Sequence, residues 1–193
     1  MTTAAAHERV LVDTVLFGNI VVERTDTRVS TRLESDDSIV VTIERSGPRK
    51  RKRVPIGTRK ADRLSARIND RKIALSPGKG ILTLRSYRVV AEIEGRYLSL
   101  RPVDVESSLF IGGKPNEAEK EFGELTAGTG GTIDMVWAVP RTVTILKKSV
   151  EITPPEPTIE DLLIGYAMAA AFGTGGLPLT AVVLGLMNAS QPV

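Results

Sequence analysis

Short runs of alternating apolar and polar positions follow one another from residue 9 to residue 45. They read RVLVDTVLF, NIVVERT and SIVVTIER, and Asn, Asp, Thr and Ser separate them. Alternation with a period of two is typical of half-buried antiparallel strands, because successive side chains of a strand point to opposite faces. This part of the chain is therefore predicted to form several short strands.

Two hairpins are predicted in the middle of the chain. In SYRVVAEIEGRYLSLRPV, every second residue of Tyr87–Ile93 shares one face, and Glu94 and Gly95 supply a tight turn. In IALSPGKGILTL, the run Pro77–Gly80 provides the fixed and positive φ values that a chain reversal needs.

Further short strands are predicted toward the C-terminus, and no helical pattern separates them. They are Phe110-Ile111, Phe122–Leu125, Thr132–Val139 and Thr142–Ile152. Many short strands without intervening helices are typical of antiparallel barrels and sandwiches. The predicted fold class is mainly β, an antiparallel barrel or sandwich over residues 9–153.

The last part of the chain has a different pattern. After the proline-rich stretch 154–157, Thr158 is a predicted N-cap with carboxylates in the first turn that follows. No charged residue occurs from Leu162 to Val193, and LLIGYAMAAAF is apolar on all sides. Such a helix is expected to pack in or against the β domain. The predicted organisation is a disordered N-terminus (1–8), the β domain (9–153), a linker (154–157), an apolar helical segment (158–188) and a tail (189–193).

A membrane anchor over residues 162–187 is the alternative to a core helix. An uninterrupted run of this length would cross about 30 Å of hydrocarbon. The sequence GTGGLP divides it into pieces shorter than a span, and no Lys or Arg follows it. We favour the core helix, and the membrane anchor stays open as the alternative.

The amino-acid composition argues against several kinds of metal and catalytic site. The chain has no cysteine, and His7 is its one histidine, so disulfides, zinc sites and histidine-based triads are not expected. The glycine-rich stretches lack the spacing of phosphate-binding loops. We predict no catalytic residue, no cofactor and no small-molecule substrate, with a hydrolase using an unidentified carboxylate pair as the runner-up class.

The expected location is the cytoplasm, with peripheral or anchored membrane attachment as a further prediction. The N-terminal sequence MTTAAAHERVLVDTVLF lacks the basic region and long apolar run of a secretory signal. The absence of cysteine fits a reducing compartment. A bias of 17 Arg over 9 Lys suggests a bacterial source.

Basic residues are concentrated in one region. Between Arg45 and Arg101 there are 17 basic and 4 acidic residues, a net of +13 in a chain whose total is +3. The strongest local signal is the run Arg49, Lys50, Arg51, Lys52 and Arg53, bracketed by Pro48 and Pro55. Adjacent cations repel, so these five are expected on a solvated loop or edge strand, or against an anion.

Three partners of the basic run stay open: water alone, an anionic membrane surface, and nucleic acid. Aromatic residues make up only 4% of the chain, which disfavours base stacking. The predicted function is a non-catalytic binding or scaffold module that binds anionic lipid peripherally through the basic loop. A nucleic-acid-binding protein using residues 45–101 is an alternative, as is the anchor at 162–187. A protein partner or homo-oligomer is also open.

In layout the chain resembles the tubby C-terminal-like group, which includes LURP-one-related proteins and phospholipid scramblases. VLFGNIVVERTD and RSYRVVAEIEGRYLSLRP are similar to its repeated strand pairs, and LLIGYAMAAAF is similar to its helix. The resemblance implies a barrel with the helix threaded through it. It also implies phosphoinositide binding through basic surface residues, as in some members, although no ligand residue can be carried over. The apolar tail after Gly173 departs from the pattern.

Overall fold

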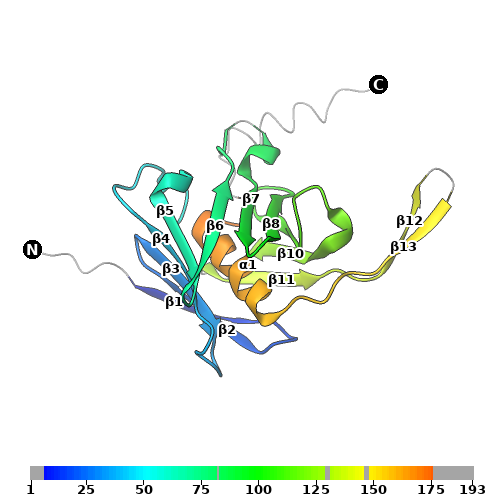
Figure 1. Cartoon of the computed structure of the whole chain (residues 1–193), viewed down its shortest axis with the longest axis horizontal. Helices are drawn as coiled ribbons and strands as arrows, with labels where there is room; N and C mark the ends of the chain where they lie inside the picture. The colour runs from blue at the N-terminus through cyan, green and yellow to red at the C-terminus, as the bar shows by residue number, and fades with distance from the viewer. Residues whose placement is uncertain (1–6, 82, 129–130, 146–147, 176–193) are drawn as a thin grey trace, which may run out of the picture.

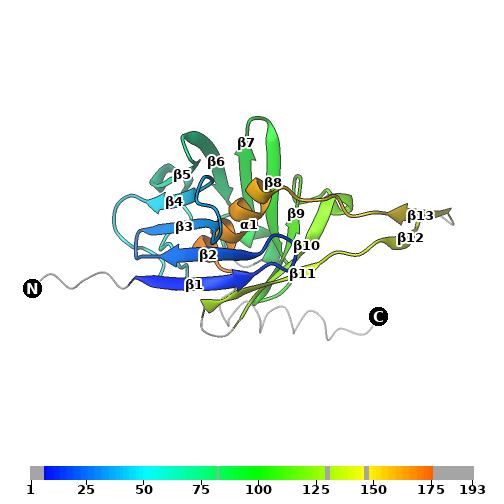
Figure 2. The ribbon, with the colours of Figure 1, turned by 90° about the horizontal axis from the view of Figure 1, so that it is seen from below.

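Eleven consecutive strands form one antiparallel sheet that curves into a nearly closed barrel (Figures 1 and 2). The structure, a computed structural model, describes residues 7–81, 83–128, 131–145 and 148–175. The strands are β1 (Glu8–Asp13), β2 (Asn19–Arg24), β3 (Arg28–Leu33), β4 (Val41–Arg45), β5 (Leu64–Ile68), β6 (Arg71–Pro77), β7 (Val89–Ile93), β8 (Arg96–Pro102), β9 (Ser107–Ile111), β10 (Glu121–Ala127) and β11 (Ile133–Trp137). The mainly β prediction is confirmed, and the barrel is the form adopted.

The barrel has a seam between its first and last strands. β1 and β11 lie side by side (Figure 2), but the backbone ladder runs only from β1 through to β11 and does not join the two. The Trp137 indole nitrogen donates to the Thr14 carbonyl across the seam at 3.2 Å. Because each strand is antiparallel to the next and their number is odd, β1 and β11 run in the same direction.

The helix α1 (Ile159–Phe172) lies within the curve of the sheet (Figure 1). It contacts β2, β3, β4, β7, β8 and β11, and every residue from Asp161 to Phe172 is buried. The predicted cap is present, because Thr158 and Asp161 each accept a hydrogen bond from the other's backbone N–H at 3.2 and 3.0 Å. A helix with no polar face is stable in water only when it is surrounded in this way.

The position of α1 bears on the alternative of an anchor over residues 162–187. Residues 162–172 of that segment are buried within the barrel. The helix ends at Phe172, followed by Gly173 at φ 81°. Residues 176–188 of the predicted helical segment, and the tail 189–193, lie outside the described residues. No helix in the described part of the chain has the length and apolarity needed to cross a membrane.

One predicted hairpin is confirmed and the other is wrong. Glu94 and Gly95 have φ values of 50° and 81° and connect β7 with β8, as a two-residue hairpin turn requires. The run Pro77–Gly80 does not return the chain into a second strand, because β6 pairs with β7. The intervening residues form a loop that includes the 3-10 turn η2 (Leu84–Tyr87), which also holds Tyr87 outside the strand predicted for it.

The remaining predicted strands differ in detail. Residues predicted as one strand at Thr142–Ile152 form a hairpin of β12 (Arg141–Ile145) and β13 (Lys148–Ile152), which projects from the barrel as an arm (Figures 1 and 2). β1 begins at Glu8, one residue before the predicted start of the β domain. Two further 3-10 turns, η1 (Ala61–Arg63) and η3 (Ala118–Lys120), lie in the loops after β4 and β9.

In an antiparallel meander, alternate loops lie at the same end of the barrel. The loops after β2, β4, β6 and β8 therefore gather at one end, together with the last turn of α1. We call this the basic end. The opposite end holds the first turn of α1, the β7–β8 turn and the loop after β9, and Arg96 of β8 contacts Asp161 of α1 there at 2.8 Å.

Candidate functional site

The basic run lies in the loop after β4, and this loop closes the basic end of the barrel. Val54 and Ile56 are buried in the core, and the Ile56 N–H donates to the carbonyl of Ala171 in the last turn of α1 at 2.9 Å. Gly57 turns the chain at φ 80°, where a Cβ atom would meet the Arg49 side chain at 2.6 Å. The apolar residues anchor the loop, so the cations face outward. The run is a loop rather than an edge strand.

Arg49 is the member of the predicted run that already has an acidic partner. Its Nη1 donates to Asp26 Oδ1 at 2.7 Å, while Arg45 donates from below to Asp26 Oδ2 at 2.6 Å. The hydrogen bond from Arg49, together with the charge of both arginines, lowers the pKa of Asp26 from its ordinary value of 3.8. Arg49 therefore belongs to an ion-pair network and is the least free of the five to bind an external anion.

Of the other four residues of the run, one side chain is held by hydrogen bonds and three are exposed. Arg51 donates to the Lys79 and Gly80 carbonyls at 2.8 and 3.3 Å, which ties the loop after β4 to the loop after β6. Lys50, Lys52 and Arg53 are exposed. In the described part of the chain, none of these three side chains forms a hydrogen bond or an ion pair. The structure thus does not bring the five residues together as one surface.

A cleft of about 410 Å³ lies where the two loops meet, and we call it the end cleft. Its lining residues come from the loops after β4 and β6; they are Lys50, Arg51, Thr58, Arg59, Lys60, Lys79 and Ile81. Five are basic, and no carboxylate is among the described residues that line it. Arg59, Lys60 and Lys79 were not in the predicted site. Only the broad basic excess between Arg45 and Arg101 pointed toward them.

Arg59 forms the floor of the end cleft. It is only 7% exposed, and its guanidinium donates to three backbone carbonyls: Gly78 at 2.8 Å, Tyr87 at 2.5 Å and Arg88 at 3.1 Å. It also lies 5.4 Å from the centroid of the Phe172 ring. No carboxylate neutralises it among the described residues, and its partners there are backbone carbonyls and aromatic rings.

Burial is the main cause that lowers the pKa of Arg59 to about 10, and repulsion from Arg51 contributes to the same shift. Two guanidiniums therefore share the cleft at an electrostatic cost. A nearby negative charge would relieve this repulsion. No carboxylate among the described lining residues supplies such a charge.

One exposed apolar side chain, Ile81, lines the end cleft, and others lie on loops at the same end of the barrel. Ile81 and Leu84, both on the loop after β6, are 53% and 40% exposed. Val103, on the connection after β8 at the same end, is 44% exposed. Cations beside exposed aliphatic side chains are the combination that suits a membrane interface, where headgroups meet acyl chains.

Two other clefts have balanced charges. One, of about 520 Å³, lies beside Asp26 and is lined by residues that include Glu8, Arg24 and Arg49. Glu8 and Arg24 form an ion pair across it at 3.5 Å. Its cations already have acidic partners within the described residues, which leaves less reason to bind an external anion.

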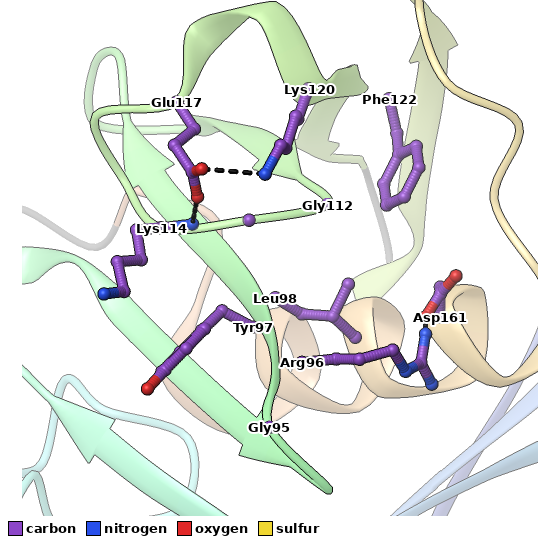
Figure 3. A pocket seen from close by; sticks show the side chains of 11 residues that line it. Gly95, Arg96, Tyr97, Leu98, Gly112, Lys114, Glu117, Lys120, Phe122 and Asp161 are labelled. Atoms are coloured by element: carbon purple, nitrogen blue, oxygen red, sulfur yellow. Dashed lines mark hydrogen bonds and ion pairs between the residues drawn. The ribbon is translucent and has the colours of Figure 1, made fainter.

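The second balanced cleft, of about 330 Å³, lies at the opposite end near the start of α1 (Figure 3). Arg96 pairs with Asp161 at 2.8 Å, and Lys120 pairs with Glu117 at 2.7 Å. The hydrogen bond from Lys120 is the main cause that lowers the pKa of Glu117. Lys114 lies over the Tyr97 ring, 4.8 Å from its centroid.

Another exposed apolar group follows the seam and the turn after β1. It comprises Leu11, Val15, Leu16, Val136 and Val139, of which Val15 is 80% exposed. No cleft of basic residues accompanies it in the described structure.

The aromatic residues do not form a stacking platform at the basic end. Tyr87 is 7% exposed and lies beneath Arg59, 5.5 Å from its guanidinium carbon. Tyr97 is at the opposite end, and Trp137 is partly buried at the seam. Single-stranded nucleic acid is usually held by exposed aromatic rings, so the described part of the end cleft favours a phosphate-rich surface over unpaired bases.

Comparison of this chain with protein-family models, with curated proteins and with solved structures finds no match.

Proposed function

We propose that this protein is a non-catalytic module that binds peripherally to anionic membrane surfaces, with its basic end toward the bilayer. The observation that carries the proposal is the end cleft, in which five basic side chains converge without a carboxylate among the described lining residues. Ile81 lines the same cleft and is 53% exposed. Lipid phosphate would occupy the cleft while the aliphatic side chains at this end of the barrel enter the interface.

The described part of the chain ends at the same end of the barrel. Gly175, the last described residue, donates its N–H to the Ser108 hydroxyl at 3.2 Å, beside the loop after β8. The basic loops and several exposed aliphatic side chains lie at this end as well.

The relationship to the tubby C-terminal-like group is part of the proposal. Its support is the order of many short strands followed by a helix enclosed in the barrel. Phosphoinositide binding by some members of that group fits an anion-binding basic end. The proposal also includes a cytoplasmic location, where anionic lipid is presented to a protein made in a reducing compartment.

The contribution of the cleft can be estimated from three exposed lysines that have no acidic partner in the described structure: Lys50, Lys60 and Lys79. A basic residue near an anionic bilayer contributes about 1 kcal/mol. Changing all three to Gln is therefore expected to weaken binding by about 3 kcal/mol, which is roughly a 150-fold rise in Kd.

The experiment is co-sedimentation with vesicles of phosphatidylcholine containing phosphatidylserine, over a salt series starting at about 50 mM. The matched control changes Lys72, Lys114 and Lys120 to Gln, which removes the same charge from the opposite end. We expect the control to keep most of its binding and the cleft variant to lose it. Equal losses in both variants would show that net charge alone drives binding, and would overturn the assignment to the end cleft.

Nucleic acid is tested in the same series by electrophoretic mobility shift. Counterion release makes such binding fall steeply with salt. A shift with DNA or RNA that only the cleft variant loses, in the absence of vesicle binding, would replace the membrane proposal with the nucleic-acid alternative.

A further inference from the structure

A second group of arginines lies on the outer flank of the barrel near the basic end. Three arginines line a cleft of about 260 Å³ together with Pro115 and Asn116 of the loop after β9; they are Arg85, Arg88 and Arg101. We call it the arginine cleft. It shares no lining residue with the end cleft. The loop after β6 separates the two, because Lys79 and Ile81 face one cleft and Arg85 faces the other.

The backbone holds these arginines close together. The β7–β8 ladder ends with Val89 opposite Leu100. Arg88, immediately before β7, and Arg101 of β8 are each one residue beyond that pair. Arg85 lies three residues before Arg88, in η2, and all three arginines line the same cleft, where their like charges repel.

The cleft is also firmly positioned. The Arg101 guanidinium donates to the Pro115 carbonyl at 3.2 Å. The Arg88 carbonyl accepts hydrogen bonds from the Gly78 N–H at 2.8 Å and from Arg59 at 3.1 Å. The Ser86 hydroxyl braces the loop in between by donating to the Thr83 carbonyl at 2.6 Å. The side chains that face the cleft therefore start from a rigid backbone, which reduces the entropy lost when they bind a ligand.

The absence of acidic partners distinguishes these three arginines from most others in the described structure. Eight arginines lie within ion-pair distance of a carboxylate: Arg24, Arg28, Arg32, Arg45, Arg49, Arg71, Arg96 and Arg141. The arginine cleft contains none of the described carboxylates. Three neighbouring guanidiniums thus line this cleft without a carboxylate among its described lining residues.

We propose that the arginine cleft binds the phosphate of a phosphomonoester. Planar guanidiniums donate pairs of parallel hydrogen bonds, which match the several oxygens of a phosphate group. The Asn116 amide adds a neutral donor. A volume of about 260 Å³ is below the range usual for drug-sized ligands, about 300–1,000 Å³, so the cleft takes a single small anionic group.

The terminal phosphate group that the cleft would bind can come from a lipid headgroup that is a phosphomonoester or from free phosphate. The lipid source rests on the proposed membrane function, because the cleft would then lie beside the inserted Ile81 and Leu84. The chemistry of the cleft does not depend on that function. Its test therefore has one arm in solution and one on vesicles.

In the solution arm, the full-length protein is titrated with inorganic phosphate at constant ionic strength, and the arginine side-chain Nε–H signals are followed by NMR. We expect saturable shifts at Arg85, Arg88 and Arg101. In the variant R85Q/R88Q the remaining Arg101 signal should no longer shift, whereas in the control R9Q/R67Q, which removes two exposed arginines elsewhere, all three signals should still shift. The variant Arg101→Lys retains the charge but not the planar fork, so weaker binding by this variant supports recognition of phosphate oxygens.

In the vesicle arm, phosphatidic acid, a phosphomonoester, is compared with phosphatidylglycerol, a phosphodiester, at matched surface potential. We expect the parent protein to prefer phosphatidic acid by about tenfold or more and R85Q/R88Q to bind both equally. Saturable phosphate binding without vesicle binding would identify free phosphate as the source and contradict only the membrane function. Vesicle binding in which R85Q/R88Q keeps the preference, or no phosphate binding in solution, would overturn the arginine cleft.

Discussion

Replacement of Arg59 by Met tests whether a buried, unpaired guanidinium stabilises the basic end. Arg59 bridges both ends of the loop after β6, since it donates to the Gly78 carbonyl on one side and to the Tyr87 and Arg88 carbonyls on the other. Met fills much of the same volume but donates no hydrogen bond. The substitution therefore leaves the packing of the side-chain stem and removes the bridge.

The expected loss of stability depends on how many backbone carbonyls are left without a hydrogen bond when Arg59 is replaced by Met. The Arg88 carbonyl keeps a hydrogen bond from the Gly78 N–H at 2.8 Å, so two carbonyls lose the partner that Arg59 supplied. A buried acceptor without a partner costs about 1–3 kcal/mol. Removing the buried charge of Arg59 offsets part of this loss of stability, because burial disfavours the charged form, as the lowered pKa of Arg59 indicates. We expect a net loss of about 3 kcal/mol from a total stability of about 5–15 kcal/mol.

Urea unfolding followed by circular dichroism measures this loss. At the size of this chain, it corresponds to a fall in Tm of about 6–12 °C. Arg59→Lys keeps a charge but cannot reach both sides of the loop, so it should fall between the parent and Arg59→Met. Arg67→Met is the control, because Arg67 is exposed on β5, and a surface change of this kind is usually within about 0.5 kcal/mol. If Arg59→Met is as stable as the parent or more stable, the desolvation of the charge outweighs the bridge and the reasoning is wrong.

Two further predictions concern the core and the ion pairs. Truncation after Pro157 removes six large buried side chains of α1, namely Leu162, Leu163, Ile164, Tyr166, Met168 and Phe172. At about 2–5 kcal/mol each, the summed loss exceeds the total stability of about 5–15 kcal/mol, so the shortened chain should lack a cooperative unfolding transition. The control, truncation after Gly175, should keep this transition. A folded 1–157 fragment would contradict the role of α1. For Asp26, the lowered pKa means that its stabilising contribution is present above the unfolded value of 3.8 and is lost as pH falls through the folded value. Asp26→Asn should therefore lower the urea midpoint at pH 7 and have a smaller effect near pH 3, and an equal effect at both would show that the ion pairs with Arg45 and Arg49 contribute nothing.

Local patterns were sufficient for the elements whose structure depends on neighbours in sequence. The alternation of apolar and polar residues predicted the strands, and Glu94-Gly95 predicted a turn, because these features need only a few adjacent residues to take effect. The helix over residues 159–172 had to be buried because it has no polar face. The sequence IALSPGKGILTL contained the same kind of turn signal but led to a wrong hairpin, since Arg59 and Ser86 hold that segment as a loop.

The candidate site was only partly predictable, because local sequence patterns do not show which distant residues a side chain will contact. The five-cation run lies at the end of the barrel that holds the end cleft. Adjacency in sequence does not determine direction in space, however, because Arg49 turns to Asp26 and Arg51 to the loop after β6.

By itself, then, the sequence determined a mainly β chain with a helix that must be enclosed and a positive middle region. Only the tertiary structure decided that the sheet closes around the helix and that Lys50, Arg59 and Lys79 share one cleft. It also decided that Arg85, Arg88 and Arg101 line one cleft. The physical reason is that strand pairing sets which distant loops become neighbours, and the register of the completed sheet, unlike hydrophobic periodicity, is a property of the whole chain.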